Sequence, residues 1–382
     1  MTTRAPRKHS AAFTLIEMMI SVAVLAIITV YMTGMLVQQS RGYEVVDNVT
    51  ETQQSERAVG DLLERDVLAT GLLVAAGGVV SGVDNTGPAG VPVSDVFCVT
   101  DADAIANPTS ISDAGLGIRI TGGYTGVGAG NVLVLASGSL EPTAAPAYDN
   151  TGPPDGTLDT DFFFSPGTGQ AGGVIVTNPA NPAGGSQCGL ITNIQPGVAP
   201  RVTVDFTIRV GGLALVPNPA PNVVPAVAGT PPIAIPAHIY FIRPVTGVRS
   251  PQLMRDSMLL ADDVEDLQVA YFHDNDFDGN CDANEWSGGD CPAAGVQGFP
   301  AFQANAVNNC FLRAVRINFV ARTASQDAVV AQNPALAPYG FVRTENAPAR
   351  VGFDGFRRRA FSRTINPRNS PINSGQVPRG CS

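Results

Sequence analysis

The spacing of apolar residues divides the chain into three stretches. Residues 13–37 are almost wholly apolar, with one charged side chain, Glu17, among 25 residues. A helix of this length rises about 1.5 Å per residue and can cross a hydrocarbon core of about 30 Å. Over residues 38–70 apolar side chains recur at helical spacing among acidic ones, which predicts that the helix continues in amphipathic form. Gly71 is a typical stop signal, so we expect this helix to end near Ala69.

After residue 70 the apolar period falls to two, and short apolar runs alternate with stretches rich in glycine and proline. This pattern predicts strands joined by long surface loops. The runs lie at residues 91–100, 116–121, 131–137, 173–177, 201–216, 238–243, 264–273, 312–322 and 358–365. We therefore expect an α+β fold in which a long helix, transmembrane and then amphipathic, precedes a β-rich, mostly antiparallel globular domain over residues 71–382. One alternative divides this domain into two lobes, residues 71–236 and 237–382.

Charge and residue types exclude several classes of function. The chain has 33 acidic and 23 basic residues and a net charge of −10, whereas nucleic-acid binding requires a basic surface. All the basic residues except Lys8 are arginines, which excludes P-loop and Schiff-base lysine chemistry. The sequence also has no nucleophile elbow, catalytic-triad order or metal-ligand histidine pair. We expect a protein that is not an enzyme and binds no nucleic acid.

The cysteines are six in number and include no CxxC pair, which favours disulfides in an oxidising compartment over a zinc site. They are Cys98, Cys188, Cys281, Cys291, Cys310 and Cys381. Six cysteines allow 15 pairings, of which Cys281 with Cys291 is a local one around an acidic loop. Six unpaired buried thiols are the alternative.

That acidic loop, residues 274–285, has the sequence DNDFDGNCDANE and satisfies the calcium-loop pattern D-x-[DN]-x-[DN]-G-x5-E at every position. The spacing directs alternate oxygens to one centre, the glycine permits a sharp turn, and the final glutamate binds with two oxygens. The predicted calcium ligands are Asp274, Asp276, Asp278, the backbone carbonyl of Asn280, Asp282 and Glu285. Because a strand is predicted at residues 264–273, we expect a calcium loop between strands and not an EF-hand; the alternative is a solvated acidic turn.

The amino terminus combines a basic leader with an acid inside the apolar stretch. Residues 1–12 carry three basic residues and no acid, which predicts that they stay in the cytoplasm. A cleaved secretory signal fits poorly, because its apolar region is shorter and ends in a small-residue cleavage site. A carboxylate within a membrane helix costs several kcal/mol unless a partner neutralises it, so Glu17 indicates a functional role.

The run AFTLIE at residues 12–17 resembles the processing site of type IV prepilins and pseudopilins. The resemblance implies that a prepilin peptidase cleaves the leader, residues 1–12, between Ala12 and Phe13 and methylates the new terminus. It also implies that Glu17 pairs with the terminal amine of a neighbouring subunit during assembly. Ala12 stands where the family usually has glycine. Loss of the leader removes three positive charges and takes the net charge from −10 to −13.

Three later runs, ADDVEDLQVAYFHD (261–274), LRAVRINFVART (312–323) and RRRAFSRTINPRN (357–369), resemble the C-terminal half of the large minor pilins called pilus-assembly protein PilW. The resemblance implies a pilin-like domain and a minor pilin that primes or caps a type IV pilus, a fibre of cell adhesion and motility. Its expected partners are other pilins, through the helix, and the inner membrane. We expect one membrane span with a periplasmic domain before assembly and a place on the cell surface afterwards.

Two alternatives stay open: a pseudopilin of a type II secretion system, and a membrane-anchored periplasmic binding module or enzyme. Residues 71–260 show no such resemblance. The basic run Arg357–Arg359 is expected on a solvated strand edge, the alternative being contact with another pilin.

Overall fold

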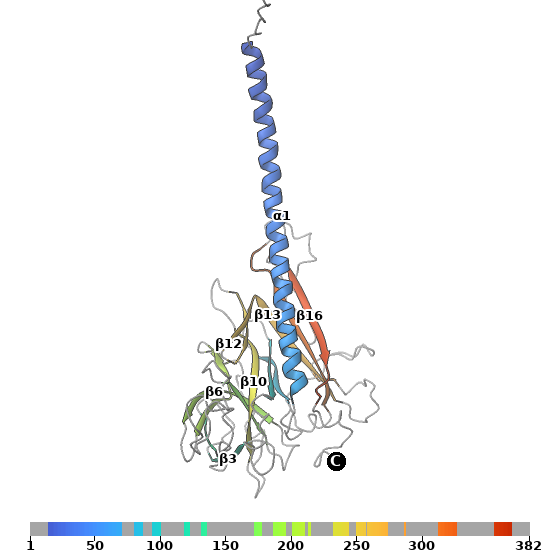
Figure 1. Cartoon of the computed structure of the whole chain (residues 1–382). Coiled ribbons are helices and arrows are strands. Elements are labelled where there is room, and N and C mark those ends of the chain that lie inside the picture. Colours follow the sequence, from blue (N-terminus) through green and yellow to red (C-terminus); the bar gives the residue numbers. More distant parts are fainter. Residues whose placement is uncertain are drawn as a thin grey trace, which may run out of the picture. The chain divides into compact units, whose positions relative to one another are not determined.

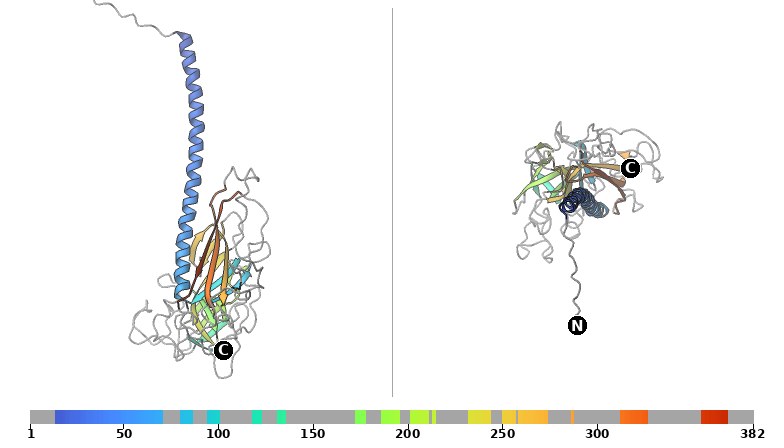
Figure 2. Two further views of the ribbon diagram at one scale, coloured as in Figure 1. Left: turned by 90° about the vertical axis from the view of Figure 1, so that its right-hand side faces the viewer. Right: turned by 90° about the horizontal axis from the view of Figure 1, so that it is seen from above.

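The computed structural model describes one α-helix and several antiparallel β-sheets (Figures 1 and 2). The described residues are 14–70, 80–86, 94–100, 118–122, 131–135, 172–177, 186–195, 201–210, 213–214, 232–243, 250–256, 258–273, 286–287, 312–326 and 355–368. The chain divides into two units, Met1–Glu51 and Thr52–Ser382, and each is described by itself. A long apolar helix followed by antiparallel sheets confirms the predicted fold class.

The helix α1 spans Leu15–Ala69 and ends at the residue where its apolar period predicts the end. Within the first unit none of its described residues is buried. Within the second unit the buried residues recur every three or four positions, as expected for one face of a helix. They are Glu56, Val59, Gly60, Leu63 and Val67.

The larger sheet contains ten strands. They are β1 (Val80–Thr86), β2 (Ser94–Thr100), β3 (Ile118–Gly122), β4 (Asn131–Leu135), β5 (Gly173–Thr177), β6 (Ser186–Gln195), β7 (Arg201–Asp205), β10 (Ile233–Arg243), β11 (Gln252–Arg255) and β12 (Met258–Asp262). Their order is β1-β2-β10-β3-β4-β7-β6-β5, with β11 and β12 attached beside β10. Because β10 also pairs with β5, the ring β10-β3-β4-β7-β6-β5 closes on itself.

We call this closed ring the barrel: strands β3 to β7 together with residues 233–236 of β10. The rest of β10 pairs with β2 through residues 237–240 and with β11 through residues 240–243. The 11-residue strand β10 thus passes from the barrel into an open sheet. In Figure 1, β3 lies toward one end of β10 and β12 toward the other.

A second sheet has the order β14-β13-β15-β16, all antiparallel. Its strands are β13 (Val264–His273), β14 (Trp286–Ser287), β15 (Leu312–Arg322) and β16 (Arg358–Ile365), and a separate pair is formed by β8 (Arg209–Val210) and β9 (Leu213–Ala214). The name platform is used below for three parts taken together: the second sheet, the open part of the first sheet, and residues 52–69 of α1. Both views show β16 running beside the last turns of α1 (Figures 1 and 2).

The sequence pattern locates β13, β15 and β16 correctly, since the runs at 264–273, 312–322 and 358–365 coincide with them. It misses β1, β6, β11 and β12. The boundary of the two-lobe alternative, between residues 236 and 237, falls inside β10, whereas the change from one sheet to the other comes at Asp263.

One disulfide joins the two parts of the first sheet. Cys98 of β2 and Cys188 of β6 are bonded, with their Cα atoms 6.5 Å apart and 90 residues between them in sequence. The expectation of disulfides is met for this pair. Cys281, Cys291, Cys310 and Cys381 lie outside the described residues.

Candidate functional site

The amino end of α1 is closed by a reciprocal contact between Thr14 and Glu17. One oxygen of the Glu17 carboxylate accepts hydrogen bonds from the backbone N–H and the hydroxyl of Thr14, both at 2.9 Å. The Glu17 N–H in turn donates to the Thr14 hydroxyl at 3.4 Å. This is a capping box, which satisfies donors at the end of the helix and places a negative charge at its positive pole.

The capping box does not neutralise the charge of Glu17. The next charged residue along α1 is Arg41, about 36 Å further along the axis at 1.5 Å per residue. The contact with Thr14 therefore orients the carboxylate, and no basic residue in the first half of the described helix lies near enough to neutralise it.

The first half of α1 is long and apolar enough to cross a membrane, by length and composition. An 18-residue window in it has a mean hydropathy of 2.3, and none of that window is buried. Its hydroxyl groups bond within the helix: Ser21 donates to the Glu17 carbonyl at 2.7 Å, and Thr29 donates to the Leu25 carbonyl at 2.8 Å. Such bonds remove the cost of placing hydroxyl groups in hydrocarbon.

The last turns of α1 pack on the second sheet through an apolar row. Val59, Leu63 and Val67 are buried in a cluster with residues of β13, β15 and β16. Gly60 lies under the ring of Phe361, since a Cβ atom added there would be 2.5 Å from the ring's Cζ atom. That ring stacks on Phe319 with centroids 4.7 Å apart. Glycine at residue 60 thus permits an aromatic pair to approach the helix backbone.

Acidic residues of α1 contact arginines of β16 beside this row. Glu56 Oε2 lies 3.1 Å from Nε of Arg359, and Glu64 Oε2 lies 2.7 Å from a terminal nitrogen of Arg363. Glu56 is buried, whereas the Arg359 side chain is 58% exposed. Burial raises the pKa of the Glu56 carboxyl, and Arg359 offsets part of that rise. Its second oxygen, Oε1, has no hydrogen bond within the described part of the chain, so the pairing is incomplete.

Asp66, one turn before the helix ends, contacts the first sheet. Its Oδ2 atom lies 2.7 Å from a terminal nitrogen of Arg255 and accepts a hydrogen bond from the hydroxyl of Tyr240. Tyr240 is fully buried. Burial, followed by the nearby Asp66 carboxylate, raises the pKa of the Tyr240 hydroxyl well above its usual value. Asp66 therefore fixes the end of α1 to β10 and β11.

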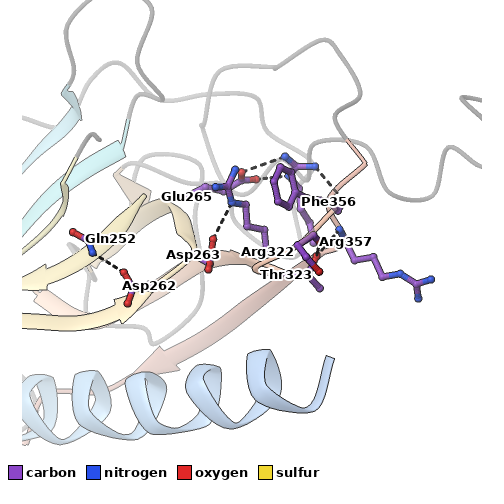
Figure 3. Close-up of polar contacts among 10 residues, drawn as sticks. Gln252, Asp262, Asp263, Glu265, Arg322, Thr323, Phe356 and Arg357 are labelled. Carbon is purple, nitrogen blue, oxygen red and sulfur yellow. Dashed lines mark hydrogen bonds and ion pairs between the residues drawn. The ribbon is translucent and has the colours of Figure 1, made fainter. Parts of the chain in front are cut away.

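The two sheets meet at a polar corner, shown in Figure 3. Asp263 has a φ of 61°, a left-handed conformation that aspartate tolerates better than most residues. Its side chain accepts a hydrogen bond from Nε of Arg322 at 3.2 Å, and its carbonyl accepts one from the Arg322 N–H at 2.9 Å. The Arg322 guanidinium lies 4.2 Å from the ring centroid of Phe356, a cation–π contact. These contacts hold the turn between β12 and β13 against the ends of β15 and β16.

The same corner contains a buried ion pair. Both carboxylate oxygens of Glu265 accept hydrogen bonds from Arg358, whose side chain is 1% exposed. Thr323 N–H donates to the Arg357 carbonyl at 2.9 Å, and the Arg357 N–H returns a bond to the Thr323 hydroxyl. The expectation that the basic run lies on a solvated edge is therefore wrong for Arg358. Its partner Glu265 is on β13, two strands away in the sheet, and the local run gives no sign of that acid.

Side chains of β2 also bind the edge of β13. The Asp95 carboxylate accepts a hydrogen bond from the Val269 N–H at 2.7 Å. Ser94 accepts one from the Leu267 N–H at 3.4 Å and donates to Asp266 at 3.0 Å. All these residues are buried, so polar side chains complete backbone pairing where the two sheets meet.

The remaining predicted site residues fall outside the described residues: Ala12, Phe13 and the whole calcium pattern, residues 274–285. Its flanks are described, and Phe272 of β13 pairs with Trp286 of β14. The twelve residues of the pattern thus connect two paired strands. Within the described ranges no group of three or more His, Cys, Asp or Glu residues is placed to hold a metal.

Sequence reasoning did not identify the residues that fix α1 to the platform. The signal for three of them is the period of two along β16, which places Arg359, Phe361 and Arg363 on one face. No local signal marks Tyr240 or Arg255, because their partner Asp66 is far away in sequence.

Two family models match the chain. Residues 7–33 match the prokaryotic N-terminal methylation motif, which together with the apolar helix defines a prepilin-type amino terminus. Residues 239–369 match Type IV Pilus-assembly protein W. The chain therefore carries an N-terminal methylation motif and a region similar to Type IV Pilus-assembly protein W, and these matches point to a structural or assembly protein of a type IV pilus.

Comparisons with individual proteins add little. A type IV-like pilin from Thermus thermophilus is 14% identical over an alignment that covers 35% of this chain and 64% of that pilin, with a TM-score of 0.19. A score this low carries no argument about the fold. Among curated proteins no relative of the chain is found.

The matched regions cover the first part of the helix and most strands of the platform. Residues 239–369 begin within β10 and include β11 to β16, and they supply every residue named above as a contact of α1. The barrel strands β3 to β7 lie outside both matches.

Proposed function

We propose that the protein is a minor pilin of a type IV pilus, an assembly subunit that primes or caps the fibre. The observation that carries this proposal is the methylation motif running directly into an apolar helix whose first turn presents Glu17. Prepilin peptidase would cleave between Ala12 and Phe13. The chain would then span the inner membrane once, with a periplasmic domain, before it joins other pilins through α1.

In this proposal Glu17 pairs with the methylated terminal amine of a neighbouring subunit. Loss of Lys8 with the leader leaves no side-chain amine in the mature chain, so the terminal amine is its one amine. The capping box supports this role, because it holds the carboxylate at the helix end while its charge stays unpaired within the helix.

The charge of Glu17 can be tested separately from its capping role. Glutamine also completes a capping box, so Glu17→Gln should keep the helix end while it removes the charge. We expect both Glu17→Gln and Glu17→Ala to lower the amount of protein in sheared surface fibres, with normal membrane insertion. Glu44→Ala, which removes an exposed acid from the same helix, is the matched control. Wild-type incorporation of Glu17→Gln would contradict the role of the charge.

Mass spectrometry of the terminus tests the processing step. We expect a mature chain that begins with methylated Phe13. Presence of the chain in surface fibres favours the minor pilin, whereas a fibre confined to the periplasm favours the secretion pseudopilin.

We also propose that residues 274–285 bind calcium. The pairing of β13 with β14 supports this, because it brings together the two strands that flank the twelve-residue pattern. Five carboxylates within these twelve residues repel one another unless a cation lies among them. Bound calcium would stabilise the folded domain by mass action.

Thermal unfolding with calcium and with chelator tests this site. Calcium should raise the melting temperature of the unmutated chain, and Asp278→Ala should abolish the increase. Asp155→Ala, in an acidic segment that lacks the spacing, should retain it. Identical melting curves of the unmutated chain in calcium and in chelator would refute calcium binding.

A further inference from the structure

The barrel and the platform have separate apolar cores. The barrel core is formed by residues of β3 to β7, Phe206 and Ala234. The platform core is formed by residues of α1, β2, β10 to β13, β15 and β16, and no residue of β3 to β7 belongs to it. Regions with their own buried clusters can open separately, because each retains its own cooperative contacts.

A third apolar cluster lies between these cores. It contains Val96 and Met254 from platform strands, Ile175 from the barrel strand β5, and one face of β10. Gly173, at the start of β5, lies against Ile239 of β10 so closely that no Cβ atom would fit. Among the described residues the barrel thus contacts the platform through an apolar seam along β10, beside which β6 also meets β1 and β5 meets β2.

The Cys98–Cys188 disulfide lies in this seam. Cys98 is on β2 of the platform and is fully buried, and Cys188 is on β6 of the barrel and is 7% exposed. Between residues 118 and 232 the sequence contains no other cysteine. No second disulfide can therefore join the barrel strands β3 to β7 to the platform, whatever the other four cysteines do.

We propose that this disulfide is a redox-sensitive strap: it couples the barrel to the platform, and its reduction loosens the barrel while α1 stays docked. The proposal does not depend on the pilus function. The reductant is a dithiol, whose thiolate attacks one sulfur to form a mixed disulfide that its second thiol resolves. Two electrons and two protons pass to Cys98 and Cys188, and the dithiol becomes a cyclic disulfide. Because both sulfurs are buried, the reaction requires local opening of the seam.

Reduction of the disulfide should loosen the barrel because it removes a restriction on the opened chain. The disulfide closes a loop of 90 residues, and such a crosslink restricts the opened state more strongly than a short one. That loop contains the strands β3, β4 and β5, whereas none of β10 to β16 lies within it. Removal of the disulfide should therefore favour opened states of the barrel over opened states of the platform.

Amide hydrogen exchange of the full chain in detergent micelles tests the proposal. The variant is Cys98→Ala with Cys188→Ala, because alanine places no polar group in the apolar seam. We expect exchange in β4, β6 and β7 to accelerate by more than about tenfold. Exchange in β15, β16 and residues 52–69 of α1 should stay within about twofold of the unmutated chain. Dithiothreitol should accelerate barrel exchange in the unmutated chain and add nothing in the double variant, which separates this bond from the other cysteines.

Three results would overturn the proposal. Equal acceleration in barrel and platform would show one cooperative unit. No acceleration anywhere would show that the seam holds without the bond. A double variant that fails to fold would show that the platform requires the strap.

Discussion

Gly60 offers a direct test of how α1 meets the platform. In an exposed helix Gly→Ala stabilises by about 1 kcal/mol, because glycine loses more backbone entropy on folding. At residue 60 the added methyl group would lie 2.5 Å from Cζ of Phe361, so the ring has to move away from Phe319. Overpacking of this kind costs about 1–3 kcal/mol, and an aromatic pair contributes about 0.5–1.5 kcal/mol. The cost exceeds the gain, and we expect Gly60→Ala to destabilise the domain by about 1 kcal/mol.

The sign should reverse when the ring is absent. In a Phe361→Ala background the methyl group meets no ring, so Gly60→Ala should stabilise by about 1 kcal/mol. The double-mutant cycle then gives a coupling energy of about 2 kcal/mol, measurable by guanidinium unfolding of the full chain in micelles. Gly42→Ala is the matched control, since nothing lies within 4 Å of a Cβ atom there and helicity should only increase. Additive effects of Gly60→Ala and Phe361→Ala would refute the proposed contact.

Three further contacts can be tested by unfolding. Burial raises the pKa of Glu56 in the folded state, so over a range of pH the folded chain keeps a proton that the unfolded chain has released. The free energy of unfolding should therefore fall as the pH rises from below 4.5 through the raised pKa. Glu56→Gln should flatten this dependence, and Arg359→Ala should extend it to higher pH; identical pH profiles would contradict the assignment. Asp95→Ala should destabilise by about 1–3 kcal/mol because the Val269 N–H loses its acceptor, and Asp95→Asn, which keeps an acceptor, should cost less. Tyr240→Phe should cost about 1–2 kcal/mol in denaturant unfolding by removing one hydrogen bond to the carboxylate at the end of α1, and an unchanged midpoint would argue against that bond.

The sequence predicts best those elements whose pattern is local. The helix to Ala69 and the strands β13, β15 and β16 each have a continuous apolar period, and that period fixes both type and extent. Strand β11 pairs with β10 and strand β12 pairs with β11, and each has only four or five residues, which is too short a window for a pattern to identify it. Closure of the barrel depends on β10 pairing with both β3 and β5, which is a relation between distant strands and leaves no local signal.

The same distinction explains the candidate site. The calcium pattern is a local spacing that the sequence shows directly, whereas the capping box of Thr14 and Glu17, although also local, is found only in the structure. The contacts that fix α1 to the platform join residues up to about 300 positions apart, such as Glu56 with Arg359, and no spacing rule connects them. Charge provides a partial signal: the described residues of β15 and β16 with their flanks, 312–326 and 355–368, contain eight arginines and no acidic residue. A run of arginines on two strands of the domain in an acidic chain implies that carboxylates from other elements meet it, and β13 supplies one to the buried Arg358 while α1 supplies others to the more exposed Arg359 and Arg363. An arginine-rich strand in an acidic protein therefore predicts internal docking onto the chain's own carboxylates more strongly than it predicts an external acidic partner.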